Sequence, residues 1–276
     1  MSSIDFIKMH GLGNDFVVID GRSRPIALSD ARARAIADRR TGVGCDQLII
    51  LEPATDSSAA LFMRIHNADG GEVDACGNAT RCVGDMVMTE TGRERAQIQT
   101  GAGLLTVWRS DDGVSVDMGK AKDRWTDIPL AEEADTLHLE IGEGPLQDPV
   151  AVSVGNPHAV FFVEDAEEID LAAAGPVLEH HPLYPERANV EAVSVLSRAH
   201  LRVRVWERGV GITRACGTGA CAAAVAAARR DLADRDLTVS LDGGDLTTSW
   251  LENGHIVMTG AVAESFRGTL PAEMAQ

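Results

Sequence analysis

Two short segments of the chain repeat one pattern, and this repetition constrains the fold more than any other feature. Residues 74–82 are DACGNATRC and residues 214–221 are RACGTGAC. Each segment places a cysteine and a glycine directly before a stretch of helix-forming residues. A thiol at a helix N-terminus faces unpaired backbone N–H groups and the positive end of the helix dipole, which favour the thiolate. Cys76 and Cys216 are therefore candidate acid/base groups that approach one substrate from opposite sides.

Polar residues upstream of the two cysteines repeat at equal intervals. In each half, a polar residue that ends a β-like stretch precedes the cysteine by nine positions: Asn67 before Cys76, and Glu207 before Cys216. An earlier asparagine precedes a second amide residue by 33 positions: Asn14 before Gln47, and Asn156 before Asn189. Asparagine is common in turns, so each coincidence alone is weak. Together they favour a duplicated α/β unit.

Strand-like stretches alternate with few helical ones along the chain. We expect helices at 29–40, 78–91, 171–180 and 218–230. One of the expected strands covers 136–141. This pattern favours an α/β (α+β-like) fold of two pseudo-symmetric domains, each a curved, mostly antiparallel sheet or barrel around a central helix. A polar stretch at 119–135 is the expected linker. The expected domains are residues 1–119 and 120–264, with residues 265–276 returning to the first.

Charge and hydropathy limit the partners and the location. The formal net charge of −17 argues against a nucleic-acid or anionic-membrane partner, since both require a basic surface. No run approaches the ~18 apolar residues that a membrane span needs. The first residues also lack the basic region and apolar core of a signal peptide. We therefore expect a cytoplasmic protein.

Cysteine and lysine usage indicates that no cofactor is needed. The chain has five cysteines without a C-x-x-C pair, so neither a metal site nor a disulfide framework is expected. A pyridoxal-phosphate enzyme needs a Schiff-base lysine and a phosphate cup. Lys8, Lys120 and Lys122 are the lysines of the chain, and no glycine-rich cup accompanies them. We expect no metal and no organic cofactor.

Several longer motifs resemble those of the diaminopimelate epimerase family. They are KMHGLGNDF at 8–16, CGNATRC at 76–82, GNPH at 155–158, ERG at 207–209 and ACGTGA at 215–220. The motifs follow the family's order and extend over nearly the whole chain. The resemblance implies a PLP-independent isomerase that interconverts L,L- and meso-2,6-diaminopimelate, a precursor of lysine and peptidoglycan. It also implies a homodimer and an active site in the cleft between the two domains.

The resemblance assigns roles to individual residues. One cysteine thiolate removes the α-proton while the other cysteine, as a thiol, protonates the opposite face of the α-carbon; the matching positions are Cys76 and Cys216. The positions that line the substrate site match Asn14, Gln47, Asn67, Gly77, Asn78, Asn156, Asn189, Glu207, Arg208, Gly217 and Thr218. Arg208 is expected to bind the distal carboxylate of the substrate bidentately. It could also form a structural ion pair with the adjacent Glu207.

Other readings of the same residues stay open. A proline racemase or 4-hydroxyproline epimerase would also use two cysteines, and a thiol redox protein or a non-catalytic binding module are readings from other classes. Ile212 stands where many family members have glutamate, which affects only local detail of its loop. The three histidines near the motifs, His10, His66 and His158, are expected to be hydrogen-bonded structural residues. Cys82 and Cys221 are expected to be buried packing residues, and Cys45 has no assigned role.

Overall fold

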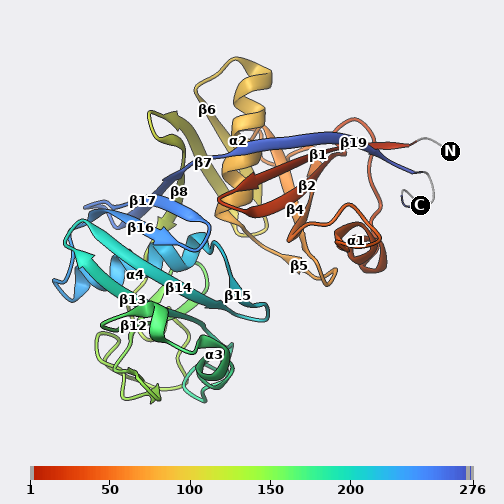
Figure 1. The fold of residues 1–276 in the computed structure, drawn as a ribbon. Helices are drawn as coiled ribbons and strands as arrows, with labels where there is room; N and C mark the ends of the chain where they lie inside the picture. Colours follow the sequence, from red (N-terminus) through yellow and green to blue (C-terminus); the bar gives the residue numbers. More distant parts are fainter. Residues whose placement is uncertain (1–2, 272–273, 275–276) are drawn as a thin grey trace. The chain divides into compact units, whose positions relative to one another are not determined.

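A computed structural model describes residues 3–271 and 274. The chain divides into two compact units, the first made of the residues up to 116 and from 260 onward, the second of residues 117–259 (Figure 1). The predicted domain boundaries, at 119/120 and 264/265, stay a prediction. Of the C-terminal segment expected to return to the first domain, residues 272–273 and 275–276 lie outside the described residues.

The first unit is a mixed sheet with two helices. Its elements in chain order are β1 (Ile4–Gly11), β2 (Asn14–Asp20), α1 (Asp30–Ala37), β3 (Gln47–Glu52), β4 (Leu61–Asn67), β5 (Glu72–Val73), α2 (Gly77–Thr91), β6 (Arg95–Thr100), β7 (Gly103–Ser110), β8 (Gly113–Lys120, which continues past residue 116) and β19 (Ala263–Leu270). β2 pairs parallel with β3 and β4 parallel with β6, whereas the other pairs of this unit are antiparallel. β19 lies antiparallel to β1, so the end of the chain adds a strand beside its beginning.

The second unit repeats this order. Its elements are β9 (Gly142–Glu143), β10 (Leu146–Gln147), β11 (Val150–Ser153), β12 (Pro157–Phe162), η1 (Ala166–Glu168), α3 (Leu171–Glu179), β13 (Asn189–Ser197), β14 (His200–Glu207), β15 (Gly211–Thr213), α4 (Gly217–Arg229), β16 (Asp236–Leu241), β17 (Gly244–Trp250) and β18 (His255–Gly260). β12 pairs parallel with β13 and β14 parallel with β16, as at the equivalent places in the first unit. α4 contacts strands from β11 to β17, and its residues from Gly219 to Ala227 are all buried.

The register of the parallel strands matches between the units. Phe16 lies opposite Gln47 in the first unit, and His158 lies opposite Asn189 in the second. In each pair the first residue comes two positions after the asparagine of the sequence repeat. A shift of one residue would turn every side chain to the other face of a strand. The shared register therefore points the repeated polar residues the same way in both units.

The four predicted helices are present, and their ends differ from the expected ones by a few residues. α2 and α4 each begin one residue earlier than expected, because Cys76 and Cys216 themselves are the N-cap residues. α1 ends at Ala37 and not near residue 40, since the Asp38 carboxylate accepts hydrogen bonds from the backbone N–H groups of Arg40 and Thr41.

The strand expected at 136–141 is wrong. This segment forms turns: the backbone of Asp135 accepts from His138 N, and its carboxylate accepts from Leu137 N. The Arg230 guanidinium also binds the Leu137 carbonyl, at 2.6 Å from Nη2. The segment also exchanges isolated backbone hydrogen bonds with residues 148–151, such as Ala151 N to the Thr136 carbonyl at 2.8 Å, so its backbone groups are paired without a regular strand ladder.

No helix in the described part of the chain is both long enough and apolar enough to cross a membrane.

Candidate active site

Cys76 lies at the centre of the first half-site, where β5 leads into α2. Its backbone is extended, and Gly77 and Asn78 begin the helix directly after it. Asn14, at the start of β2, places its Oδ1 3.9 Å from the Cys76 sulfur. The same oxygen accepts a hydrogen bond from Asn78 Nδ2 at 3.2 Å. Three of the predicted residues therefore surround this thiol from two different elements.

Gln47 and Asn67 form the second polar pair of this half-site. They lie opposite each other on β3 and β4, and Gln47 Nε2 donates to Asn67 Oδ1 at 2.9 Å. This hydrogen bond fixes both amides, because an amide oxygen can only accept and an amide nitrogen can only donate. The Asn67 NH2 group is thereby directed away from Gln47.

Two residues that the sequence analysis did not single out orient the asparagines beside Cys76. Arg81, fully buried one turn into α2, donates from Nη2 to Asn78 Oδ1 at 2.8 Å. Asp46 Oδ2 accepts from Asn14 Nδ2 at 2.9 Å and from Asp15 N at 3.1 Å. Arg81 lies within the motif at 76–82 and Asp46 directly precedes Gln47, yet only their contacts show what they do.

Cys216 occupies the matching place in the second half-site. It is the N-cap residue of α4, and its sulfur accepts a hydrogen bond from Gly219 N at 3.4 Å. Thr218 Oγ1 lies 3.5 Å from the sulfur and accepts from Asn156 Nδ2 at 3.4 Å. Gly217 opens the helix between them. The predicted residues Cys216, Thr218 and Asn156 thus form one connected polar chain.

Asn189 and Arg208 meet at the end of β14. Asn189 Oδ1 accepts from Arg208 N at 2.9 Å, and its Nδ2 donates to the Pro157 carbonyl at 3.0 Å. The Arg208 side chain donates from Nη1 to the Glu186 carbonyl, which leaves its other guanidinium N–H groups to be used elsewhere. Glu207 precedes it at the last position of β14.

Glu179, at the end of α3, braces this strand end and was not predicted. Glu179 is 3 % exposed, and its carboxylate accepts from Trp206 Nε1 at 2.7 Å and from Gly209 N at 3.0 Å. It therefore holds the residues on both sides of Glu207 and Arg208. A buried glutamate on a helix carries no sequence signal that would separate it from an ordinary surface residue.

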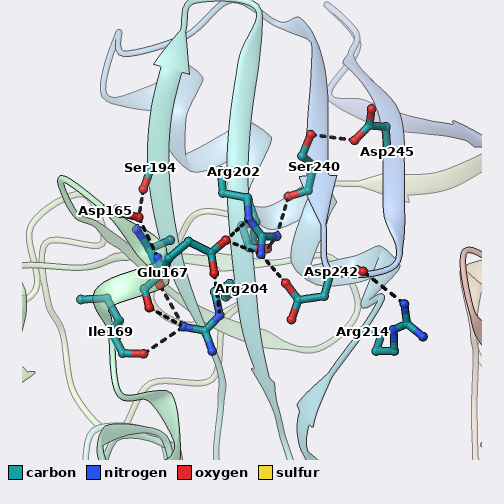
Figure 2. A network of polar contacts seen from close by, with 12 residues as sticks. Asp165, Glu167, Ile169, Ser194, Arg202, Arg204, Arg214, Ser240, Asp242 and Asp245 are labelled. Carbon is teal, nitrogen blue, oxygen red and sulfur yellow. Dashed lines mark hydrogen bonds and ion pairs between the residues drawn. The ribbon is translucent and has the colours of Figure 1, made fainter.

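A second polar network braces the segment that leads to Cys216 (Figure 2). Arg202, on β14, forms ion pairs with Glu167 of η1 and with Asp242. The Asp242 carbonyl in turn accepts from Arg214 Nη2 at 3.5 Å, two residues before the cysteine. Arg204 binds the carbonyls of η1 from the same strand. This network links β14, η1 and the entry to α4.

The electrostatics of Cys216 differ from the prediction. Burial raises its pKa well above the ordinary value, the negative charge of Glu207 raises it further, and the hydrogen bonds from Thr218 and Gly219 N only partly offset these effects. The predicted lowering by the helix N-terminus is therefore wrong for Cys216, because the residue is only 5 % exposed and desolvation outweighs the hydrogen bonds from Thr218 and Gly219 N. Cys216 is a thiol near neutral pH in this structure.

Comparison with known proteins identifies the family. The family model described as diaminopimelate epimerase matches residues 6–123 and 150–264. The diaminopimelate epimerase of Rhodospirillum centenum is 58% identical over 96% of this chain and 91% of its own length. That of Acidiphilium cryptum is 54% identical over 98% of this chain and 97% of its own.

The chain belongs to the diaminopimelate epimerase family. Solved structures with low identity support its fold class. A probable proline racemase from Agrobacterium radiobacter K84 has a TM-score of 0.70 and 16% identity, with 97% of this chain and 93% of that chain covered. A hydroxyproline epimerase from Agrobacterium vitis has a TM-score of 0.69 and 15% identity, with 97% and 92% covered. The predicted two-domain α/β fold of this family is confirmed.

The remaining cysteines of this family member lie in the packed interior. Burial raises the pKa of the Cys45 thiol to about 11 and that of the Cys82 thiol to about 12. Cys221 is fully buried on α4. Cys82 and Cys221 are therefore buried packing residues, as predicted. Ile212, which departs from the common family pattern, lies half-exposed on β15.

The three histidines differ in their surroundings. His66 Nδ1 lies 3.2 Å from the Gly70 carbonyl, in agreement with a structural role. His158 is hydrogen-bonded on both ring nitrogens, by Glu191 and by Asn156. His10 Nδ1 is buried and has no hydrogen-bond partner within the described residues, so the predicted hydrogen bond of this ring nitrogen is not found.

Proposed function

We propose that this protein is an isomerase that interconverts L,L-2,6-diaminopimelate and meso-diaminopimelate without a cofactor. Membership of the diaminopimelate epimerase family, with 58% identity to one relative over 96% of the chain, carries this proposal. The two half-sites support it, since each holds a cysteine as the N-cap residue of a helix. The substrate is a small amino acid with two amino-acid ends.

The proposed chemistry is a proton transfer at each face of one α-carbon. One cysteine, as thiolate, takes the α-proton, and the electron pair of the C–H bond remains on the substrate as a carbanion. The other cysteine, as thiol, gives its proton to the opposite face, so the configuration is inverted and the two cysteines exchange protonation states. In the reverse direction Cys76 and Cys216 exchange roles. The two thiols titrate as a coupled pair.

Two helix N-termini are suited to stabilise the carbanion. An α-proton is weakly acidic, so the developing negative charge needs preorganised donors. The backbone N–H groups that begin α2 at Gly77–Asn78 and α4 at Gly217–Thr218 can bind the reacting carboxylate. Glycine at the first position lets a ligand approach the backbone closely, because it has no Cβ.

The polar residues away from the cysteines are proposed to hold the distal end of the substrate. Arg208 carries a planar guanidinium that can bind a carboxylate through two parallel hydrogen bonds. Its side chain already uses Nη1 on the Glu186 carbonyl, which holds it in place before substrate arrives. Asn67, Asn189 and Glu207 would then bind the distal ammonium and carboxylate groups. Asn14, Gln47 and Asn156 complete the proposed binding set.

One incubation tests the reaction. The reduced protein, without pyridoxal phosphate, receives L,L-diaminopimelate, and chiral analysis follows the appearance of the meso isomer. We expect conversion by the native protein and none by Cys76→Ala or Cys216→Ala, since each variant lacks the proton carrier of one face. Turnover of L-proline or trans-4-hydroxy-L-proline in place of diaminopimelate would assign the site to the racemase chemistry of its structural neighbours. A single variant with near-normal activity would refute the two-cysteine assignment.

We also propose that the protein acts in the cytoplasm as a homodimer, as the family resemblance suggests. Light scattering coupled to size-exclusion chromatography tests the second part directly. A mass of about twice the 29.3 kDa of one chain is expected, and the mass of one chain would contradict the proposal.

A further inference from the structure

A fully buried carboxyl–imidazole contact lies beside the Cys216 half-site. Glu191, on β13, and His158, on β12, each have no exposed surface, and Glu191 Oε1 lies 2.7 Å from His158 Nδ1. The second carboxylate oxygen, Oε2, has no hydrogen-bond partner in the described part of the chain. A buried carboxylate with one unsatisfied oxygen is costly. The proposed chemistry uses neither residue, so this cost needs an explanation.

The two neighbours of the His158 ring determine its protonation. Nδ1 faces a carboxylate oxygen, and Nε2 faces Asn156 Oδ1 at 2.9 Å. With Glu191 ionised and the Asn156 oxygen toward the ring, both neighbours accept, and only the imidazolium carries a proton on each ring nitrogen. In that arrangement the positive charge of the ring and the negative charge of Glu191 compensate each other inside the protein. Burial raises the pKa of Glu191, and the charge and hydrogen bond of His158 offset that effect only in part.

The charge state of the ring sets the orientation of an amide in the proposed substrate site. With the imidazolium, Asn156 Oδ1 accepts from Nε2, and Nδ2 points to Thr218 Oγ1 at 3.4 Å. A neutral ring with its proton on Nδ1 would present a bare Nε2. The Asn156 amide would then have to turn over, so that its oxygen and not its NH2 group faced Thr218.

The equivalent asparagine of the first unit has no such dependence. Asn14 donates from Nδ2 to the Asp46 carboxylate and accepts through Oδ1 from Asn78, whose own amide is fixed by Arg81. The end groups there are a carboxylate and a guanidinium, and their donor or acceptor character does not change near neutral pH. The two repeated asparagines thus present opposite ends of their amides to the helix N-termini. Only Asn156 needs a charged histidine to do so.

We propose that Glu191 is a positioning residue that, by holding His158 as an imidazolium, makes Asn156 present its NH2 group to the substrate. This proposal rests on the proposed function in one respect, the contact between Asn156 and substrate. Glu191 contacts neither substrate nor the cysteines in this account, although its negative charge also acts to raise the pKa of the Cys216 thiol. Its carboxylate acts through the ring, and the ring acts through the amide.

The charge state of His158 can be measured without turnover. Nitrogen-15 NMR of the histidine-labelled protein, with His158 assigned through its backbone, distinguishes an imidazolium from a neutral ring. We expect an imidazolium in the native protein and in Glu191→Asp, and a neutral ring in Glu191→Gln. A neutral His158 in the native protein would overturn the proposal, even if the enzyme epimerises diaminopimelate as proposed.

Turnover tests the step from ring to amide. Glu191→Gln should lower kcat/KM roughly 10- to 100-fold, as expected when a charged ligand group loses one hydrogen bond. In Asn156→Asp both terminal atoms of the side chain are carboxylate oxygens, which accept hydrogen bonds. Turning this side chain over therefore does not change what it presents to Thr218 or to the ring. We expect Glu191→Gln to have little further effect in the Asn156→Asp background. Effects that multiply would show that Glu191 acts in some other way and would refute the proposal.

Tyr184→Phe is the matched control. The Tyr184 hydroxyl is buried and donates to the backbone carbonyl of His158 at 3.4 Å, so its removal disturbs the same residue without touching the ring. We expect an unchanged ring charge and nearly native kcat/KM in this variant. A loss equal to that of Glu191→Gln would mean that any disturbance near His158 suffices, which would contradict a specific role for Glu191. If the native protein does not act on diaminopimelate at all, the proposed function fails, while the NMR result still decides the charge of His158.

Discussion

At the scale of single residues, Cys216 shows how a helix terminus and burial compete. The sequence places it correctly at the start of a helix, and Gly219 N does donate to its sulfur. Burial and the charge of Glu207 nevertheless raise its pKa. The sequence indicates the effect of the helix dipole on the thiol, because that effect depends only on the cysteine's position at the start of a helix. Desolvation depends instead on the residues of β13, β14 and α4 that pack around the sulfur.

The effect of Glu207 on this thiol can be tested by alkylation. Glu207→Gln removes a negative charge, which lowers the pKa of Cys216 and increases its thiolate fraction at any pH below that pKa. Iodoacetamide should therefore modify Cys216 several-fold faster at pH 8, as followed by peptide mass spectrometry. Glu143→Gln, an exposed change on β9, should leave the rate unaltered. A slower reaction in Glu207→Gln would contradict this assignment.

Asp15 gives a second prediction at this scale. Burial acts to raise its pKa, but hydrogen bonds and charges from Arg39 and Lys8 more than offset this and hold the pKa well below its ordinary value. A carboxyl with a lowered native pKa stabilises the fold above its unfolded pKa of about 3.9 and loses that contribution as the pH falls through the native pKa. Asp15→Asn should therefore cost about 2 kcal/mol of unfolding free energy at pH 7.

The cost of Asp15→Asn should shrink as the pH falls from 5 toward 3, as measured by urea denaturation at each pH. Asp20→Asn is the control, because its ion pair with Arg22 is far more exposed and should contribute under ~1 kcal/mol. A cost that stays constant with pH would show that the Asp15 charge is not the cause.

The predicted site residues were found through motifs, and the residues that orient them were not. Cys76, Asn78 and Thr218 lie in segments whose repetition is visible in the sequence. Glu179 and Glu191 lie in ordinary helix and strand sequence, and their importance comes from the atoms that surround them. Burial of a carboxylate is a tertiary property, so residue type and spacing do not indicate it.

At the scale of elements, packing of α2 depends on Gly84. A Cβ at this position would lie 2.4 Å from Val107 Cγ2 and 2.9 Å from Val107 Cβ on β7. Alanine favours a helix over glycine by about 1 kcal/mol, whereas overpacking costs about 1–3 kcal/mol. The added Cβ would clash with Val107, whose β-branched side chain cannot easily move away. The cost of this clash should therefore outweigh the gain in helix propensity.

Gly84→Ala should therefore lower the unfolding free energy by about 1 kcal/mol. The same change in a Val107→Ala background should raise stability, because the clash is gone and the helix preference remains. Thermal unfolding of the four proteins of this cycle decides the matter. A stabilising Gly84→Ala in the native background would contradict the tight contact between α2 and β7.

Element types were easier to predict than element ends. The helices α2 and α4 follow from long helix-forming runs, whereas the parallel pairing of β2 with β3 and of β12 with β13 was not predicted. The turn segment 136–141 has a strand-like composition, but Asp135, Arg230 and the backbone of residues 148–151 satisfy its polar groups without regular strand pairing. The partner Arg230 is some ninety residues away in the sequence, so no local pattern could have shown the difference.

At the scale of the whole molecule, the chain repeats one plan twice and then returns to its start. The last strand, β19, pairs with β1 from Ile4 to His10. The rings of Phe6 and Phe266 also meet edge to face, 6.0 Å apart. The first unit therefore depends on residues from both ends of the chain.

Removal of residues 263–276 should destabilise the first unit, because it leaves one edge of β1 unpaired and uncovers Phe6. Hydrogen exchange should rise in β1 and β2, while α4 in the second unit keeps its protection. Phe266→Ala is a smaller change to the same strand and should lower the free energy of unfolding by about 1 kcal/mol through the lost ring contact. Equal loss of protection in both units would contradict this assignment of the terminal strand.

The central claim is that two cysteines carry the two protons of one inversion. The most direct test is the position of deuterium during the first turnovers of L,L-diaminopimelate in D₂O, followed by NMR and chiral separation. Two cysteines predict that each meso molecule formed carries deuterium at the inverted carbon while unconverted substrate keeps its α-protons. Meso product that retains its original proton would show that one group both removes and returns it, and would contradict the account.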